Sequence, residues 1–160
     1  MNFIHCHRPF EILLAEDNPG DVRLTREALR DTTISYHLHV VPDGVETMAF
    51  LRRQGPYGTA PRPDLIMLDL NMPRMDGRRV LARLKSDPSL RRIPVVILSS
   101  SQNDADIQSA YDLQANCYIT KPTDLDQFIM IVKEIEEFWA VTAELPQAAA
   151  PDDSPTEKTA

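Results

Sequence analysis

Short apolar runs alternate with helical patterns along this chain of 160 residues. The runs consist mainly of Ile, Leu, Val and Met without polar alternation, which is typical of strands buried on both faces of a parallel sheet. Five such runs are present, at Glu11–Glu16, Ile34–Val41, Asp64–Asp69, Ile93–Ser99 and Cys117–Thr120. Because a helical pattern follows each run, the sequence predicts an α/β fold, a doubly wound five-stranded parallel sheet with five helices.

Local signals mark the starts of three helices. Pro19 suits the first turn of a helix, where its missing N–H costs nothing. Asp43 with Glu46, and Thr123 with Asp126, have the spacing of a capping box, so we predict that Asp43 and Thr123 are N-caps.

The second run differs from the others because apolar and polar side chains alternate along it. The larger, mostly apolar set is Tyr36, Leu38 and Val40, and the polar set is Ser35, His37 and His39. This alternation predicts an edge strand, with His37 and His39 together on a solvated face. Sensing of pH by the two histidines is the alternative.

The last two helical segments suggest a surface for contacts. The segment Asp104–Leu113 offers few apolar side chains, so we expect it to be weakly anchored. The final helix carries a core stripe at Leu125, Phe128, Ile129, Val132, Ile135 and Trp139. A second, heptad-spaced set, Ile131, Phe138, Val141 and Leu145, predicts a homodimer through this helix, the fourth helix and the fifth strand. A frayed helix end with scattered apolar residues is the alternative.

Composition bounds the class of protein. The chain is 42% hydrophobic and 26% charged, as expected of one globular domain. No apolar stretch reaches membrane-spanning or signal-peptide length, which favours the cytoplasm. With 17 basic and 24 acidic residues the net charge is −7, which argues against nucleic acid as a partner. The two cysteines, Cys6 and Cys117, are too few for a disulfide framework.

The ends of the chain differ from its body. We expect a leader over residues 1–9, a domain over 10–145 and a disordered tail over 146–160, which is rich in Pro and Ala. The triplet His5-Cys6-His7 could hold a metal, but no further ligand lies near it, so a leader is the better interpretation. Since no output domain follows the predicted one, we expect the effector to be another molecule.

Polar side chains follow four of the predicted strands. They are Glu16, Asp17, Asp69, Ser99 and Lys121. The carboxyl ends of parallel strands lie at one edge of a sheet, so these groups converge there. One lysine cannot neutralise three carboxylates, and the oxygen ligands suit Mg²⁺ completed by a phosphoryl ligand. Asp69 can itself accept a phosphoryl group as an acyl phosphate. Unconnected surface carboxylates and helix caps are the alternative.

Five motifs in order carry a resemblance to a known family. They are Ile-Leu-Leu-Ala-Glu-Asp-Asn at 12–18, Leu-Ile-Met-Leu-Asp-Leu-Asn-Met-Pro at 65–73, Asp-Gly at 76–77, Pro-Val-Val-Ile-Leu-Ser-Ser at 94–100 and Tyr-Ile-Thr-Lys-Pro at 118–122. The chain resembles a response-regulator receiver domain of two-component systems. Residues 18–24, 116–118 and 138–139 resemble single-domain regulators paired with phytochrome kinases.

The resemblance implies a flavodoxin-like strand order of 2-1-3-4-5 and a phosphoryl group taken from a histidine kinase, of the bacterial phytochrome type. It implies that Asp69 is the phosphoacceptor, that Ser99 and Lys121 hold the phosphoryl group, and that Tyr118 is a switch residue. It implies Mg²⁺ ligands from Asp17, Asp69 and the backbone carbonyl of Asn71, with Glu16 acting through water. It also implies a cis peptide bond before Pro122. Glu16 followed by Asp17, in place of two aspartates, and Ser99 in place of threonine depart from the family pattern.

Two other functions fit the fold. A phosphatase with an aspartyl-phosphate intermediate needs a second acid two residues after Asp69, where this chain has Asn71. A flavodoxin-like nucleotide or flavin binder needs a glycine-rich phosphate loop, and only Gly20 occurs in the first loop. We therefore expect no enzymatic activity beyond self-phosphotransfer and autodephosphorylation at Asp69. For Tyr118, ordinary packing is the alternative to a switch role.

Overall fold

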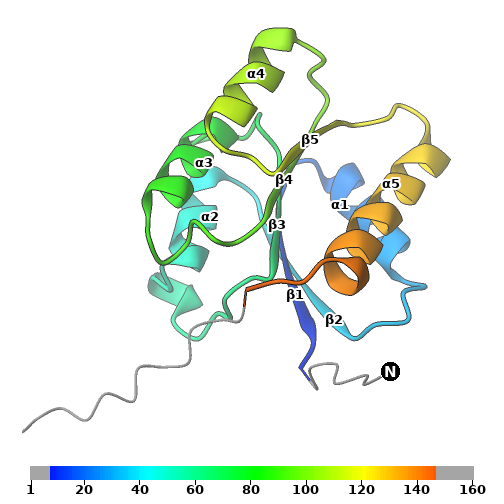
Figure 1. Ribbon diagram of the computed structural model, residues 1–160, viewed down its shortest axis with the longest axis horizontal. Helices are drawn as coiled ribbons and strands as arrows, with labels where there is room; N and C mark the ends of the chain where they lie inside the picture. The colour runs from blue at the N-terminus through cyan, green and yellow to red at the C-terminus, as the bar shows by residue number, and fades with distance from the viewer. Residues whose placement is uncertain (1–7, 147–160) are drawn as a thin grey trace, which may run out of the picture.

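The computed structural model describes residues 8–146, and Figure 1 shows a central sheet between two layers of helices. Its five parallel strands are β1 (Phe10–Ala15), β2 (Tyr36–Val41), β3 (Leu65–Leu68), β4 (Val95–Ser99) and β5 (Cys117–Thr120). Their order is β2-β1-β3-β4-β5, which confirms the predicted sheet. Most of the expected leader, with His5-Cys6-His7, and most of the expected tail lie outside the described residues.

Two strands, β2 and β4, begin two residues later than predicted, for local reasons. Pro94 has no N–H to donate to a neighbouring strand, so β4 starts at Val95 and Ile93 closes a turn on Leu90. Ile34 also lies in a turn, where its N–H points to the Thr32 hydroxyl.

The helices are α1 (Pro19–Leu29), α2 (Gly44–Leu51), α3 (Gly77–Ser86), α4 (Asp104–Asp112) and α5 (Leu125–Glu137), and they cover both faces of the sheet. Helices α1 and α5 lie on one face and α2, α3 and α4 on the other (Figure 1). The predicted roles of Pro19 and Asp43 are confirmed. The prediction for Thr123 is wrong, because Asp124 caps α5 by accepting from the N–H of Gln127 at 2.9 Å. A carboxylate one residue later offers the helix terminus a negative charge as well as an acceptor.

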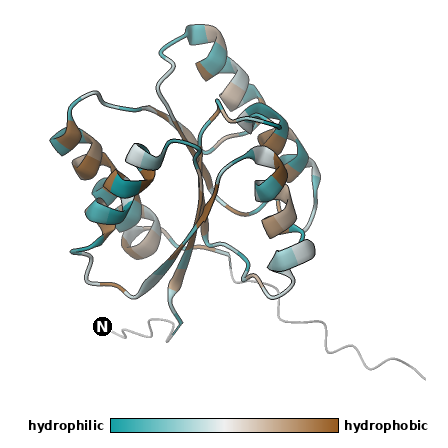
Figure 2. Ribbon diagram, turned by 180° about the vertical axis from the view of Figure 1, so that it is seen from behind, coloured by the Kyte–Doolittle hydropathy of each residue, from teal (hydrophilic) through white to brown (hydrophobic). Residues whose placement is uncertain are grey.

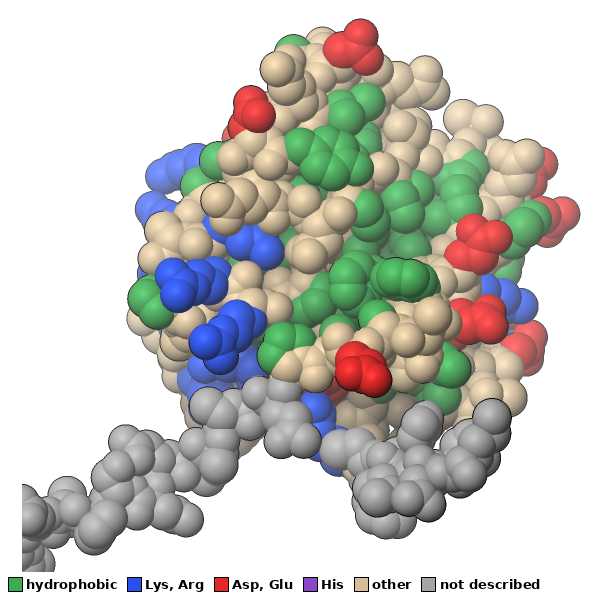
Figure 3. Space-filling view, in the orientation of Figure 1, with side chains coloured by type: hydrophobic (Ala, Val, Ile, Leu, Met, Phe, Trp, Pro, Cys, Tyr) green, Lys and Arg blue, Asp and Glu red, His purple; other side chains and the backbone are tan. Residues whose placement is uncertain are grey.

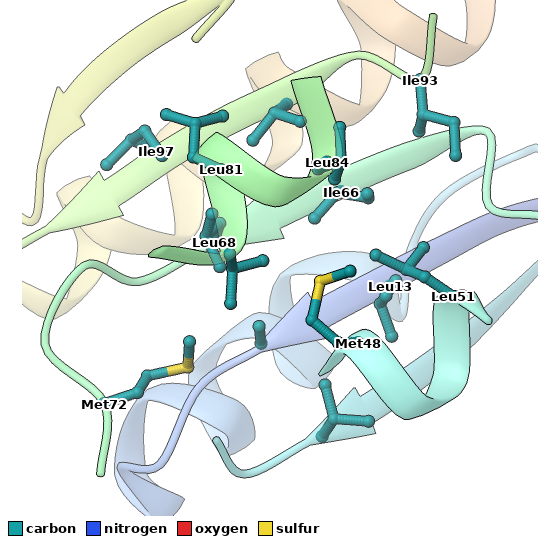
Figure 4. Close-up of a cluster of buried hydrophobic side chains, with 14 of the residues drawn as sticks. Leu13, Met48, Leu51, Ile66, Leu68, Met72, Leu81, Leu84, Ile93 and Ile97 are labelled. Atoms are coloured by element: carbon teal, nitrogen blue, oxygen red, sulfur yellow. The ribbon is translucent and has the colours of Figure 1, made fainter. Parts of the chain in front are cut away.

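The core has two parts, because successive side chains of each strand point to opposite faces. Leu13 of β1 lies beside Met48 and Leu51 of α2, and Leu81 of α3 belongs to the same buried cluster (Figure 4). Ile12 packs on the other face, toward Phe128 of α5. Figure 2 shows hydrophobic positions along the central strands and on helices of both layers.

The core stripe of α5 is mostly as predicted. Phe128, Val132 and Ile135 are buried. Leu125 is 62% exposed, so its assignment to the core is wrong; it is the first residue of the helix and lies ahead of the turns that cover the sheet.

The edge position of β2 is confirmed, but its histidine face is only partly solvated. His37 is exposed, whereas His39 packs its ring 5.2 Å from that of Phe50. Both imidazoles contact the carboxylate of Glu11, a partner that the sequence did not suggest. Burial acts to raise the pKa of Glu11, but hydrogen bonds to His39 and His37 outweigh it and lower the pKa below its ordinary value.

Two further expectations concern helices. Ala110 is the single buried residue of α4, in agreement with weak anchoring. Within residues 8–146, no helix is both long enough and apolar enough to cross a membrane.

Helix α3 begins directly against the end of β3. The N–H of Gly77 donates to the carbonyl of Leu70 at 2.9 Å. A Cβ atom at Gly77 would lie 2.3 Å from the carbonyl oxygen of Asp69 and 2.8 Å from the Cα of Leu70. Real side chains do not approach backbone atoms this closely, so only glycine permits the contact between α3 and the Asp69 backbone.

We predict that Gly77→Ala lowers the free energy of unfolding by about 2 kcal/mol, because overpacked side chains force the backbone to shift. Urea denaturation followed by circular dichroism measures the loss. Gly58→Ala is the matched control, since its Cβ would meet nothing closer than 3.9 Å at an ordinary φ of −56°. An equal effect of the two substitutions would contradict this account of Gly77.

Candidate functional site

The ends of four strands bring the predicted polar residues together at one edge of the sheet. Glu16 directly follows β1, Asp69 follows β3, Ser99 ends β4 and Lys121 follows β5. The Lys121 ammonium lies 2.6 Å from Glu16 Oε2 and 2.9 Å from Asp69 Oδ2. All three side chains are at most 9% exposed. The convergence expected from the strand ends is therefore present.

Asp21 completes the partners of the lysine, and the sequence analysis missed it. Its Oδ2 lies 2.8 Å from Lys121 Nζ. Asp21 lies in the first turn of α1, and the first turn of a helix that follows a strand lies at the same sheet edge as the strand's end. An acidic residue in that turn was the available signal.

Asp17 also belongs to the cluster. One carboxylate oxygen each of Glu16, Asp17 and Asp69 lie within 4.8 Å of one another. Capping of α1 falls to Asn18, whose Oδ1 accepts from Gly20 N at 2.8 Å and from Asp21 N at 3.1 Å. Asp17 is therefore not the helix cap, and its exposed carboxylate faces the same small volume as the two buried ones.

Backbone donors orient the two buried carboxylates. Asn18 N donates to Glu16 Oε1 at 3.0 Å, and Asn71 N donates to Asp69 Oδ1 at 3.0 Å. The second oxygen of each carboxylate contacts Lys121. Each carboxylate is thus held by one hydrogen bond from a backbone N–H and one from the Lys121 ammonium, which together fix the orientation of the carboxylate.

Four carboxylates around one ammonium make the site strongly anionic. Burial acts to lower the pKa of Lys121, but its hydrogen bonds to Asp21, Glu16 and Asp69 outweigh burial and raise the pKa. Burial and the charge of Asp69 raise the pKa of Glu16 to about 7, against the opposing effect of Lys121. The excess negative charge is partly relieved by a proton on Glu16 at low pH, and a cation relieves it at higher pH.

Ser99 and Tyr118 are connected through Ser101. Ser99 is fully buried, and its hydroxyl lies 3.3 Å from Ser101 N, which donates to it. The Tyr118 hydroxyl donates to the Ser101 carbonyl at 2.8 Å, while the Ser101 hydroxyl donates to Asp106 of α4 at 2.6 Å. Arg78 of α3 also pairs with Asp106. Ser101 is thus the common contact of the site, the β5 tyrosine and α4.

The peptide bond before Pro122 differs from the expectation. No cis peptide bond occurs in residues 8–146, so the expected cis bond is wrong for this structure. The trans form is the one that X–Pro bonds generally favour.

The comparison with protein families decides what this arrangement is. The model described as the response regulator receiver domain matches residues 12–133. The chain belongs to the response regulator receiver family. Among curated receivers, response regulator Rcp1 of Synechocystis sp. is 49% identical over 140 residues, which cover 88% of this chain and 95% of Rcp1.

Solved receiver structures agree with this family. The phosphorylated cyanobacterial phytochrome response regulator RcpA is 56% identical, with a TM-score of 0.85 over 88% of this chain and 100% of RcpA. The Mn²⁺-bound form of Rcp1 is 48% identical, with a TM-score of 0.84 over 87% of this chain and 100% of that one. Response regulator RPA3017, from red light signalling of R. palustris, is 34% identical, with a TM-score of 0.79 over 88% and 99% of the two chains.

Receiver domains bind a divalent metal, and the donor set of this receiver fits one. Its three clustered carboxylates offer the hard oxygen ligands that such cations prefer, at the edge where Lys121 is the only cation in contact with them among residues 8–146.

We predict that the affinity of this receiver for a divalent metal rises with pH and levels off above about pH 7, because the proton on Glu16 competes with the cation. Between pH 8 and pH 6 the affinity falls about tenfold. Without metal, the same proton makes the contribution of Glu16 to the free energy of unfolding decrease as pH rises from the ordinary pKa of 4.5 toward 7.

Isothermal titration calorimetry with MgCl₂ at several pH values measures this dependence. Glu16→Gln is the control, because it cannot titrate and so gives a weaker affinity that stays flat over the same range. An unchanged slope in Glu16→Gln would show that another group competes with Mg²⁺.

Proposed function

We propose that this receiver accepts a phosphoryl group on Asp69 from the phosphohistidine of a histidine kinase and signals through a conformational switch. The observation that carries the proposal is the position of Asp69: a 7% exposed carboxylate at a strand end, in contact with a buried ammonium and beside two further acids. A carboxylate in this setting is oriented for attack, and its surroundings can stabilise the charge of an added phosphoryl group.

The transfer needs one bond to break and one to form. A carboxylate oxygen of Asp69 attacks phosphorus, the bond from phosphorus to the imidazole nitrogen breaks, and an acyl phosphate results. Lys121 already contacts Asp69 Oδ2 at 2.9 Å, so its ammonium is in place to contact phosphoryl oxygens as well. Ser99 ends the neighbouring strand, and its hydroxyl is the second group that we assign to the phosphoryl oxygens.

We assign Mg²⁺ to the acidic cluster. Asp17, Asp69 and the backbone carbonyl of Asn71 would hold it, with Glu16 acting through water. When bound, the cation neutralises the carboxylates and the phosphoryl oxygens, which would otherwise repel one another. The cluster of Glu16, Asp17 and Asp69 oxygens within 4.8 Å supports this assignment.

The switch follows from the contacts of Ser101. When Ser99 shifts toward a phosphoryl group, the Ser101 N–H that bonds its hydroxyl shifts too, and the bonds from Ser101 to Tyr118 and Asp106 change. Helix α4 has one buried residue to resist this change. The proposed output is therefore a new position of α4 and of the Tyr118 ring.

We propose that the receiver hydrolyses its own phosphoryl group and no external phosphorylated substrate. Asn71 is exposed two residues after Asp69, where a phosphatase of external substrates would need a carboxylic acid. We therefore propose autodephosphorylation at Asp69 as the only turnover.

We propose a phytochrome-type histidine kinase in the cytoplasm as the phosphoryl donor. The support is the similarity to RcpA, a cyanobacterial phytochrome response regulator, over 88% of this chain, and to RPA3017 of red light signalling.

We predict that acetyl phosphate with Mg²⁺ adds one phosphoryl group to the receiver and that Asp69→Asn abolishes the addition, because the nucleophilic carboxylate is lost. Intact-protein mass spectrometry measures it. Asp31→Asn is the matched control, since the Asp31 side chain is 76% exposed and lies outside the site, and it should label like the wild type.

Labelling that persists in Asp69→Asn would overturn the assignment of Asp69. The donor class is tested separately with autophosphorylated phytochrome kinase and an unrelated histidine kinase. Faster transfer from the unrelated kinase would overturn the phytochrome pairing while leaving Asp69 as the acceptor.

We propose that the receiver forms a homodimer through the face of α4, β5 and α5, where hydrophobic side chains gather in Figure 3. Glu136 of α5 is buried and accepts from Thr32, which follows α1. At 100° per residue, Ile131 and Phe138 lie on the side of α5 away from this contact. Phe138 and Val141 are 51% and 52% exposed, which supports contact with a second copy.

The structure separates Leu145 from the other predicted dimer residues. Beyond α5 the chain forms a π-helical turn, Phe138–Thr142, and then becomes extended at Ala143. Leu145 lies beside Arg62 and Pro94, in a pocket at the other end of the sheet. Heptad spacing cannot continue through this change of backbone, so we omit Leu145 from the proposed interface.

We predict that the receiver sediments as a dimer at tens of micromolar and that Phe138→Glu weakens the dimer at least tenfold, because it buries a charge in an apolar contact. Sedimentation velocity, with and without an acyl-phosphate mimic, measures this. Val45→Glu is the control, because Val45 is 40% exposed on α2, which contacts β2 at the opposite edge of the sheet from β5. A monomeric wild type under both conditions would refute the dimer.

A further inference from the structure

A second cluster of metal-ligating side chains lies on β1 and β2, away from the phosphoryl site. His37 Nδ1 is 2.9 Å from Glu11 Oε1, and His39 Nε2 is 2.7 Å from Glu11 Oε2. One ligand atom of each of the three residues lies within 4.8 Å of the others. Glu11 is near the start of β1 and Glu16 follows its end, so five strand residues, about 16 Å, separate the two clusters.

The backbone holds these side chains in place before any ligand arrives. Glu11 pairs directly with His37 in the parallel register of β1 and β2, and His39 follows two residues later on the same face. Six residue pairs join the two strands, so neither ligand-bearing segment needs to order itself on binding. Such preorganisation removes much of the entropy cost that weak surface sites carry.

The cluster has a closed side and an open side. The Glu11 side chain is 11% exposed, and the His39 ring, 27% exposed, packs against Phe50. The His37 side chain is 58% exposed, so solvent reaches the cluster from that side. Three protein ligands with one solvent-facing position are the arrangement of an open, four-coordinate zinc site.

The distances suit a metal after a small rearrangement. A tetrahedral ion with bonds of about 2.0–2.1 Å holds its ligand atoms about 3.3 Å apart. One oxygen of Glu11 and one nitrogen of each histidine already lie within 4.8 Å of one another, and rotation of the exposed His37 side chain can bring them to that spacing. The donors are two imidazole nitrogens and one carboxylate, a set typical of zinc and its neighbours, whereas Mg²⁺ prefers oxygen ligands alone.

We propose that Glu11, His37 and His39 form a second metal site, which binds a divalent transition metal of the zinc class and ties the edge strand β2 to β1. The site differs from the acidic cluster in its donors and in its end of the sheet. Hard oxygen ligands suit Mg²⁺ at the acidic cluster, and imidazole nitrogens favour zinc at the second site, so excess Mg²⁺ can keep zinc out of the acidic cluster while the second site stays available.

Equilibrium dialysis of the full chain against Zn²⁺, with excess Mg²⁺ to occupy the acidic cluster, tests the proposal. The wild type should retain one Zn²⁺ per chain at micromolar concentration. His37→Ala should weaken retention at least tenfold, and its exposed position leaves the fold intact, as circular dichroism checks. Replacing Zn²⁺ by Co²⁺ adds a direct signal, the intense visible absorption of a tetrahedral site, which His37→Ala should abolish.

A second variant removes Cys6 and the other two histidines of the chain. His5→Ala, Cys6→Ser and His7→Ala together remove the leader triplet, and this variant should retain Zn²⁺ as the wild type does. Equal retention by the wild type and His37→Ala would overturn the proposal, and so would loss of Zn²⁺ in the leader variant with no effect of His37→Ala. Absence of any retained Zn²⁺ in the wild type would also overturn it.

Discussion

The contact between the Lys121 ammonium and three carboxylates is the interaction on which the functional edge of this receiver depends. It joins the ends of β1, β3 and β5 and the first turn of α1 at one point. Two carboxylates about 4 Å apart repel by roughly 4 kcal/mol at an effective dielectric of 20, so the lysine offsets a repulsion that would otherwise oppose the convergence of these strands. Because the lysine still leaves the cluster negative, the same contact makes the edge receptive to a cation and, with it, to a phosphoryl group.

The route from this edge to the surface is short and consists of hydrogen bonds. Ser101 contacts the Ser99 hydroxyl, the Tyr118 hydroxyl and Asp106 of α4. The bonds to Ser99 and Tyr118 join neutral groups and contribute about 1 kcal/mol each, less than charged contacts to a phosphoryl group contribute. The bond to the Asp106 carboxylate is stronger, about 1.5–3 kcal/mol, and Asp106 also pairs with Arg78 of α3. A phosphoryl group can therefore break the two neutral bonds first, and Ala110 is the single buried residue that holds α4 against the sheet.

The sheet and the main site could be predicted because both rest on strong, local signals. Buried parallel strands need continuous apolar runs, and strand ends must lie at one edge, so Asp69 and Lys121 were found without knowledge of any contact. Asp21 was missed because its role depends on the direction of a side chain in the turn after the strand. The predicted N-cap of α5 was wrong by one residue, because Thr123 and Asp124 both have a suitable partner three residues later in the sequence.

Other features depend on pairing between distant segments, which a single pattern does not reveal. Nothing about Glu11 in the sequence indicates that it lies between two histidines 26 and 28 residues away, because this requires the register of β1 against β2. Leu145 matched a heptad only as long as the helix continued, and the π-helical turn at Phe138–Thr142 ends that continuity.

The close contact of Gly77 gives the receiver two unequal sides. Helix α3 lies against the Asp69 carbonyl with no side chain between them, so the backbone of the phosphoacceptor cannot withdraw toward α3. In the proposed switch, displacement is therefore taken up on the side of β4 and α4. The packing of α3 against the end of β3 then acts as a fixed support, so that movement at Asp69 is directed to one side of the site instead of being shared between both.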